Sequence, residues 1–275
     1  MNKIKLSEIF YSFQLEGKYM GVPSVFIRTF GCNFRCASFN LPEGVPNTEV
    51  REIIKKADTY SKLSDLPLVK TGCDSYGSVY PEFKHLCNNY TVEELVAQIN
   101  ILLPFGKFNS EHLVITGGEP LLGWQEFYVD LLEQLPRLEE VTFETNGTQS
   151  INVVLSNYLN KKKKKFTFSV SPKLSCSGEN TSVSIKPNII VDYQSYGDTY
   201  LKFVVATEDD VLESLVVIET YRNAGFTGPV YLMPVGGTVD SFTLHNRQVA
   251  DLALKYGLRY SDRLQVSLYK NAWGT

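Results

Sequence analysis

The sequence has little of what a membrane protein, a disulfide-bonded secreted domain or a general nucleic-acid binder requires. No apolar run approaches the ~20 residues of a membrane-spanning helix, and residues 1–8 lack the apolar stretch of a signal peptide. The five cysteines are odd in number and unevenly spaced, so they do not form a disulfide framework. The net charge of −3 over 275 residues offers no basic surplus for nucleic acid. We therefore expect a cytoplasmic protein with no membrane partner and no direct nucleic-acid partner.

What the chain does contain is a regular alternation of strand and helix patterns. Runs rich in β-branched and aromatic residues predict strands at 24–29, 112–116, 140–144, 166–170, 200–205 and 230–233. Apolar residues at helical spacing predict helices at 91–103, 124–135, 151–159, 208–224 and 242–256. The first of these helices opens with a capping box of Thr91 and Glu94. Because this alternation implies parallel strands joined by crossover helices, we predict an α/β fold. It would be an incomplete parallel (β/α) barrel or open curved sheet of about six strands, and no linker divides residues 1–275 into two domains.

A cysteine loop, Gly31-Cys32-Asn33-Phe34-Arg35-Cys36, follows the first predicted strand. The position three residues after Cys36 holds Phe39, which binds no metal, so the best remaining third ligand is Cys73. Thiolates hold iron–sulfur clusters, and three cysteines would leave one of four irons open to a small molecule. From these residues alone, ordinary buried thiols are an equally good interpretation of Cys32 and Cys36.

Residues 41–71 would then be an insertion between the second and third cluster cysteines. Its first residues, 41–46, have the composition of a turn. Apolar residues then recur at helical spacing, at Val50, Ile53, Ile54, Ala57 and Tyr60. We predict an amphipathic helix over 48–60 whose apolar stripe packs against the body of the protein or against a partner subunit.

Short motifs, most of them polar, follow several of the predicted strands directly. They lie at Thr116-Gly117-Gly118-Glu119-Pro120, at Glu144-Thr145-Asn146-Gly147-Thr148, at Ser171-Pro172-Lys173 and at Met233-Pro234, and Arg28 ends the first strand. Any one of them could be ordinary turn chemistry, and Arg28 could form a surface ion pair. In a parallel barrel, however, the carboxyl ends of the strands converge on one face. We therefore expect these residues and the cysteine loop to form one site.

Taken together, these residues resemble the 7-carboxy-7-deazaguanine synthase family of radical S-adenosylmethionine enzymes. The motif at 116–120 belongs to the wider superfamily, whereas the stretches 11–17 and 256–275 are specific to this family. Arg28, the cysteine loop, 144–148, 171–173, 201–205 and 233–234 match as well. Two departures stand out. Phe39 replaces the family's third cysteine, with Cys73-Asp74-Ser75 restoring the local pattern, and Leu15 replaces a glycine that is usual in the family.

The resemblance implies a carbon–nitrogen lyase with a radical S-adenosylmethionine fold. Such an enzyme contracts the ring of 6-carboxy-5,6,7,8-tetrahydropterin to give 7-carboxy-7-deazaguanine and ammonia, in 7-deazaguanine (queuosine or preQ0-type) biosynthesis. The implied cofactors are a 4Fe–4S cluster, S-adenosylmethionine and Mg²⁺. The implied partners are an electron donor such as flavodoxin or ferredoxin and a second copy of the chain in a homodimer.

The resemblance also implies roles for individual residues. The cluster ligands, and with them the centre of catalysis, are Cys32, Cys36 and Cys73. The residues around S-adenosylmethionine are Gly118, Glu119, Thr145, Asn146, Ser171 and Lys173. The pterin would be held by Phe13, Gln14, Leu15, Glu16, Arg28 and Thr116, with Arg28 as the bidentate partner of its carboxylate. Ser75 stands where the family has a magnesium-binding threonine, and its hydroxyl is a hard oxygen ligand.

Two alternatives remain at this stage. A radical S-adenosylmethionine activase, which makes a glycyl radical in a partner enzyme, would share the cluster and cofactor motifs but lack the pterin-type residues. A structural zinc or nucleic-acid-binding module is the alternative of another class, yet zinc sites usually close with four Cys or His ligands. The chain has only three histidines, and His112 and His245 fall in strand or helix patterns that indicate a packing role.

Overall fold

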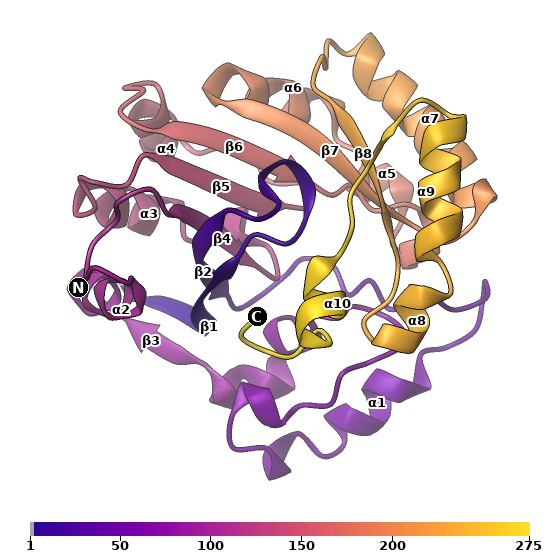
Figure 1. The fold of residues 1–275 in the computed structure, drawn as a ribbon, viewed down its shortest axis with the longest axis horizontal. Coiled ribbons are helices and arrows are strands. Elements are labelled where there is room, and N and C mark those ends of the chain that lie inside the picture. The colour runs from indigo at the N-terminus through magenta and orange to yellow at the C-terminus, as the bar shows by residue number, and fades with distance from the viewer. Residues whose placement is uncertain (1–2) are drawn as a thin grey trace.

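One nine-stranded sheet organises the molecule in the computed structural model, which describes residues 3–275 (Figure 1). Its strand order is β3-β1-β2-β4-β5-β6-β7-β8-β9, and the strands from β2 to β9 run parallel. The strands are β1 (Ile4–Phe13), β2 (Pro23–Thr29), β3 (Asn88–Tyr90), β4 (His112–Gly117), β5 (Glu140–Thr145), β6 (Lys165–Val170), β7 (Asp198–Val205), β8 (Val230–Pro234) and β9 (Arg259–Tyr260). The six predicted strands correspond to β2 and β4 to β8, so the α/β class is confirmed. Among the described strands, the two edge strands β3 and β9 do not pair with each other, so the sheet is open.

The sequence patterns missed three strands at the margins of this sheet. The most consequential is β1, which pairs antiparallel with β2 in a register that sets Glu8 opposite Arg28. A bulge between Leu6 and Glu8 interrupts this pairing. The sequence of β1 mixes polar and aromatic residues without a clear alternation, and only Ile4, Leu6, Ser7 and Phe10 are buried, so the pattern gave no strand signal. The other two, β3 and β9, are only three and two residues long.

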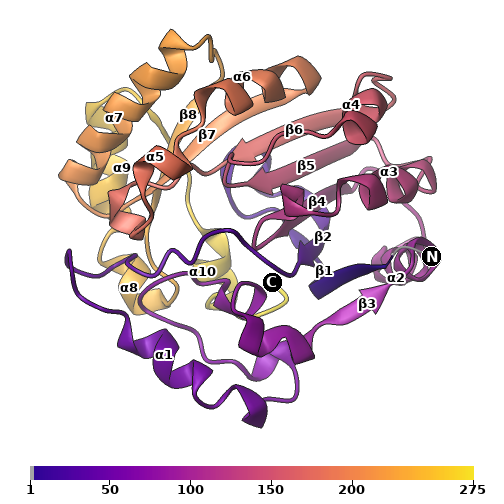
Figure 2. The same cartoon turned by 180° about the vertical axis from the view of Figure 1, so that it is seen from behind.

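Most helices lie along the outside of the curved sheet, while α10 (Leu264–Tyr269) lies on its inner side (Figures 1 and 2). The predicted helices appear as α2 (Val92–Leu102), α3 (Gln125–Glu133), α4 (Val153–Leu159) and α7 (Glu208–Asn223). The capping box at Thr91 is present, with the Glu94 amide donating to Thr91 Oγ1 over 3.2 Å. The helices that the patterns missed are α5 (Thr181–Ser184), α6 (Pro187–Tyr196) and α10 (Leu264–Tyr269). No helix within residues 3–275 is long and apolar enough to cross a membrane.

One predicted helix, 242–256, is in fact two. A separate capping box of Thr238 and Ser241 starts the short α8 (Val239–Thr243), and a turn at Leu244 and His245 separates it from α9 (Asn246–Lys255). The ring of His245 is bonded to the side chain of Asn40 over 2.9 Å, so this break contacts the segment just after the cysteine loop.

Residues 41–71 contribute most of a second, smaller apolar cluster on the side of the molecule away from α3, α4 and α6 (Figure 1). Their helix, α1 (Thr48–Ile54), is half the predicted length, because a separate 3-10 turn (Ala57–Thr59) replaces its second half. The apolar stripe packs within the same chain, in a cluster that includes Tyr76, Phe83 and Leu86.

Candidate active site

A cavity of about 250 Å³ opens at the carboxyl ends of the parallel strands. It is lined by almost every residue that the sequence singled out: Phe13, Gln14, Leu15, Glu16, Arg28, Cys32, Cys36, Cys73, Ser75, Thr116, Gly118, Thr145, Asn146, Ser171 and Lys173. Glu119 is the exception and is buried behind this lining. The structure thus brings the residues of five strand ends and one distant loop to a single place.

The cysteine loop leaves β2 and is held in shape by a second loop, residues 174–180. The backbone amides of Arg35 and Cys36 both donate to Glu179 Oε1, each over 2.7 Å. The amide of Ser38 donates to the carbonyl of Ser177 over 3.1 Å. These bonds fix Cys36 in the left-handed backbone region, at a φ of 48° that is uncommon for a residue other than glycine. Nothing in the local sequence around Glu179 indicated this bracing role.

The third cysteine reaches the cavity because the two ends of the insertion meet. The amide of Gly72 donates to the carbonyl of Phe39 over 2.8 Å. Asn40 Nδ2 donates to the carbonyl of Lys70 over 3.0 Å, and Asn47 Nδ2 donates to that of Ala37, also over 3.0 Å. These hydrogen bonds at the base of the insertion place Cys73 in the cavity wall with Cys32 and Cys36.

The other two cysteines lie elsewhere. Neither Cys87 nor Cys176 lines the cavity, and their thiols approach the backbone carbonyls of Phe83 and Val204 instead. All five cysteines are free of disulfides. Of the three cysteines beyond the cysteine loop, the structure thus places Cys73 alone in the cavity wall.

The three cavity thiols form a donor set suited to a cluster and poorly suited to a lone ion. Within residues 3–275, no group of three His, Cys, Asp or Glu side chains is close enough to hold one metal ion. A cluster is larger, because its thiolates bind different irons of one inorganic core, and three cysteines around one cavity meet that requirement. Burial raises the pKa of Cys32 to about 11 and that of Cys36 to about 12, and burial together with Asp74 raises the pKa of Cys73. The thiolate forms would therefore need a positive charge nearby, and a cationic iron centre would supply it.

Glu119 acts as a brace between two strand ends. Its carboxylate accepts hydrogen bonds from the Asn146 amide and from Thr145 Oγ1, each over 2.7 Å, and from the Leu121 amide over 3.0 Å. Burial raises the pKa of Glu119 in spite of these donors. Its two oxygens are therefore engaged inside the protein rather than presented to the cavity.

Gly118 lets the β4 loop touch the cysteine loop. A Cβ atom at this position would lie 2.3 Å from the carbonyl oxygen of Gly31, so only glycine fits. Next to this contact, Asn146 Nδ2 donates to Asn33 Oδ1 over 2.9 Å. On the adjoining strand end, Lys173 Nζ donates to Ser171 Oγ over 2.9 Å. Of these residues, Gly118, Asn146, Ser171 and Lys173 are among those that the resemblance places around S-adenosylmethionine.

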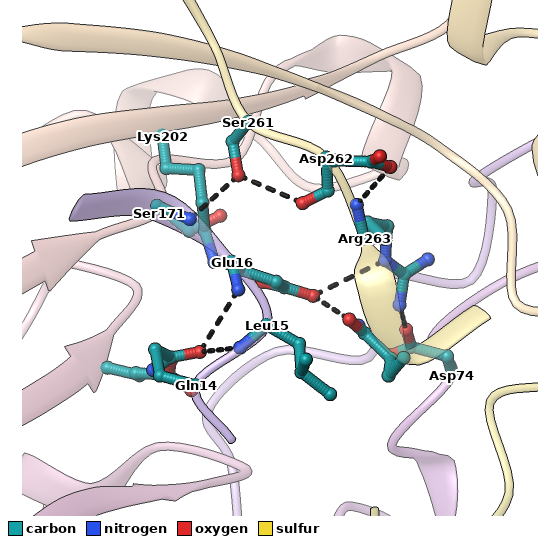
Figure 3. Close-up of polar contacts among 12 residues, drawn as sticks. Gln14, Leu15, Glu16, Asp74, Ser171, Lys202, Ser261, Asp262 and Arg263 are labelled. Carbon is teal, nitrogen blue, oxygen red and sulfur yellow. Dashed lines mark hydrogen bonds and ion pairs between the residues drawn. The ribbon is translucent and has the colours of Figure 1, made fainter. Parts of the chain in front are cut away.

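Gln14, also in the cavity wall, fixes the turn that follows β1 (Figure 3). Its Oε1 accepts from the amides of Leu15 and Glu16, over 2.9 and 3.2 Å, and its Nε2 donates to Glu144 over 3.0 Å. Leu15, which stands in place of the usual glycine, is buried, and its carbonyl accepts from the amide of Leu264 over 3.1 Å. The turn is therefore tied to the start of α10.

The Glu16 carboxylate lies between cationic groups that the sequence did not single out (Figure 3). It forms ion pairs with Lys202 and, over 3.4 Å, with Arg263, and it accepts a hydrogen bond from Gln265 Nε2 over 2.6 Å. Burial by itself would raise the pKa of Glu16, but Lys202 and Arg263 lower it to about 2. Arg263 also pairs with Asp74, the residue after the third cysteine, so one guanidinium connects the turn after β1 with the loop that carries Cys73. The sequence signals for this network were the two matched stretches that contain these residues, 201–205 and 256–275.

Arg28 is paired within the protein. Its Nε donates to Glu8 over 2.8 Å and its Nη1 donates to Ser75 Oγ over 3.3 Å. The pair is not a surface ion pair, since the side chains of Arg28 and Glu8 are only 18% and 10% exposed. Burial would lower the pKa of Arg28, but the carboxylates of Glu8 and Glu144 raise it. The guanidinium is thus held at the cavity wall as a permanent cation.

Comparisons with known proteins agree with this geometry. No family model matches the chain. A 7-carboxy-7-deazaguanine synthase from Halobacterium salinarum is 30% identical over 289 residues, covering 98% of this chain and 91% of that protein. Its counterpart from Pyrobaculum aerophilum is 28% identical over 272 residues, covering 99% and 97%. The crystal structure of QueE from Escherichia coli has a similar fold, with a TM-score of 0.57, 22% identity and coverage of 94% and 93%.

Proposed function

This chain belongs to the 7-carboxy-7-deazaguanine synthase family, and we propose that its cavity binds 6-carboxy-5,6,7,8-tetrahydropterin. The enzyme converts this pterin to 7-carboxy-7-deazaguanine with loss of ammonia, in 7-deazaguanine biosynthesis. The observation that carries the proposal is the convergence of the cysteine loop, the strand-end residues and the pterin-type turn on one cavity.

The charge of the cavity suits a substrate that carries a carboxylate. Six cationic side chains line it against four carboxylates, and the cations are Arg28, Arg35, Lys70, Lys173, Lys202 and Arg263. An excess of positive charge inside a concave wall attracts anionic ligands. Arg28 would meet the pterin carboxylate with its guanidinium, already oriented by Glu8. The turn at Gln14 to Glu16 would hold the opposite edge of the ring system.

We place a 4Fe–4S cluster on Cys32, Cys36 and Cys73, and S-adenosylmethionine beside it along Gly118, Thr145, Asn146, Ser171 and Lys173. When bound, these groups supply a carbon-centred radical that removes a hydrogen atom from the substrate. The protein's own part is to position the reactants and exclude water. Glu119 contributes by holding the strand ends that carry Thr145 and Asn146.

Magnesium is proposed at Ser75. The Ser75 hydroxyl lies between Arg28 Nη1 and Asp74 Oδ1, each 3.3 Å away, at the cavity wall. One protein oxygen fits a metal that keeps most of its water molecules and takes further ligands from the substrate. The substrate carboxylate near Arg28 would be such a ligand.

The remaining expectations stay predictions. They are a single radical S-adenosylmethionine domain over residues 1–275 with an insertion at 41–71, a homodimer, an electron donor such as flavodoxin or ferredoxin, and a cytoplasmic location.

The test is anaerobic reconstitution with iron and sulfide, followed by incubation with a reductant, Mg²⁺, S-adenosylmethionine and the pterin. We expect the pterin to be consumed and the deazaguanine acid to accumulate, as measured by mass spectrometry. Cleavage of S-adenosylmethionine without consumption of the pterin would contradict the proposal and favour a glycyl-radical activase. Binding of zinc in place of iron and sulfide would contradict the whole assignment.

A further inference from the structure

One wall of the cavity is built by two segments that are far apart in the sequence. The end of the insertion contributes Leu68 and Lys70, and the tail segment, residues 270–275, contributes its residues from Asn271 onward. The two are joined through Trp273, whose Nε1 donates to the carbonyl of Leu66 over 2.9 Å.

The apolar cluster of the insertion reinforces this joint. The ring of Trp273 packs edge-on against that of Tyr76, with centroids 5.8 Å apart. Tyr76 is fully buried, and its hydroxyl donates to the carbonyl of Pro67 over 2.7 Å. The side chains of Trp273 and Tyr76 thus hold the backbone of residues 66–67 by hydrogen bonds, directly before Leu68, which lines the cavity.

The tail segment is in turn fixed to α10. The amide of Asn271 donates to the carbonyl of Gln265 over 2.9 Å, and its side chain donates to the carbonyl of Gly237 over 2.8 Å. Lys270 and Asn271 both lie in the left-handed region, so the chain turns sharply at the end of the helix. Displacing Trp273 would therefore displace α10.

Gln265, on the first turn of α10, carries a buried acceptor with no partner. Its Nε2 donates to Glu16, whereas its Oε1 has no hydrogen bond among the described residues, although Gln265 lines the cavity. A buried carbonyl without a donor is unfavourable, and such an atom in a binding cavity points to a ligand donor. A pterin offers ring N–H groups and an exocyclic amine as donors.

We infer that the insertion is a substrate-specificity element that acts through Trp273. Trp273 is a positioning residue: it fixes the tail segment and α10 so that Gln265 Oε1 accepts a hydrogen bond from an N–H group of the pterin. This inference rests on the proposed function, because it names the way in which the same site recognises the same substrate.

The test compares Trp273→Phe and Trp273→Ala with Trp124→Phe, the matched change at the chain's other tryptophan. Trp124 is half-buried against the main core and does not line the cavity. In the cluster-free protein, Trp273→Ala should speed amide hydrogen exchange in residues 62–70 and 264–275, whereas Trp124→Phe should not.

In the reconstituted enzyme, both Trp273 variants should raise KM for the pterin, by about tenfold for alanine. The KM for S-adenosylmethionine and the iron content should stay unchanged.

The two proposals fail in different ways. If wild-type enzyme consumes the pterin and both Trp273 variants keep its KM, the specificity role is wrong while the function stands. Unchanged exchange in the cluster-free Trp273→Ala protein would also overturn the role, because the joint would then hold nothing in place. If wild-type enzyme consumes no pterin, the proposed function fails, whatever the exchange data show.

Discussion

The amide of Gly72 donates a hydrogen bond to the carbonyl of Phe39, over 2.8 Å. Phe39 occupies the position at which the family resemblance predicts a third cluster cysteine, and Gly72 directly precedes Cys73, which we propose takes its place. The bond closes the base of the insertion, so the chain can add residues 41–71 without moving its third thiol away from the cavity. Loop-closure entropy grows only logarithmically with length, which keeps the cost of such an insertion small.

The Arg28–Glu8 pair predicts how the enzyme responds to a change of cation. A lysine at position 28 keeps the charge but cannot bond Glu8, Ser75 and a carboxylate with a planar fork. Arg28→Lys should raise KM for the pterin by about tenfold or more, while slow uncoupled cleavage of S-adenosylmethionine survives. Steady-state kinetics with both substrates checks this.

The control for this prediction is Arg222→Lys, at an arginine that donates hydrogen bonds to the carbonyls of Phe226 and Gly228. Unchanged pterin kinetics in Arg28→Lys would reduce Arg28 to a structural ion pair.

The bonds from Glu179 to the cysteine loop predict an effect that appears before any cluster is bound. In the metal-free protein, Glu179→Ala should speed hydrogen exchange at the amides of Arg35 and Cys36, because both lose their acceptor. Glu179→Gln keeps a carbonyl oxygen there and should stay close to wild type. Iron bound per protein after reconstitution should fall in the alanine variant only.

A control for this experiment lies on the same loop. Glu213 accepts hydrogen bonds from Ser175, on the side of the loop away from the cysteines. Glu213→Ala should leave exchange at Arg35 and Cys36 unchanged. Equal effects of the two alanine variants would show that the loop as a whole, rather than Glu179, holds the cysteines.

The buried charges around Glu16 predict a pH dependence of stability. Because the pKa of Glu16 is lowered from 4.5 to about 2, its ionised form stabilises the fold above pH 4.5, and that contribution is lost as the pH falls towards 2. Glu16→Gln leaves Lys202 and Arg263 without their carboxylate and should lower the free energy of unfolding by about 3 kcal/mol at pH 7. Denaturant titrations of both proteins at pH 7 and pH 3 check this. The difference between them should shrink at pH 3, and a difference independent of pH would contradict the assignment.

Much of the site could be predicted because the parallel topology brings the carboxyl ends of the strands together. Once the strand–helix alternation was recognised, the residues after each strand had to share one edge of the sheet, and Thr116, Thr145 and Ser171 do line one cavity. The choice of Cys73 rested on the local sequence pattern, and the hydrogen bonds at the base of the insertion place this residue in the cavity wall.

The residues that sequence reasoning missed act over long separations. Lys202 and Arg263 pair with Glu16 across 186 and 247 positions, and no spacing rule connects such residues. Glu8 escaped notice because β1 was not recognised as a strand, so its register with Arg28 could not be foreseen. These contacts come from tertiary packing, which local pattern does not encode.

The central claim is that Cys73 completes the cluster site in place of the missing cysteine at Phe39. The measurement that tests it most directly is iron content and visible absorption after anaerobic reconstitution of Cys73→Ala, with Cys87→Ala and Cys176→Ala as controls. All three thiols are partly exposed, but only Cys73 lines the cavity. We predict that Cys73→Ala loses the cluster absorption and most of the iron, while both controls keep the wild-type spectrum. A Cys73→Ala protein that still binds four irons and cleaves S-adenosylmethionine would contradict the account.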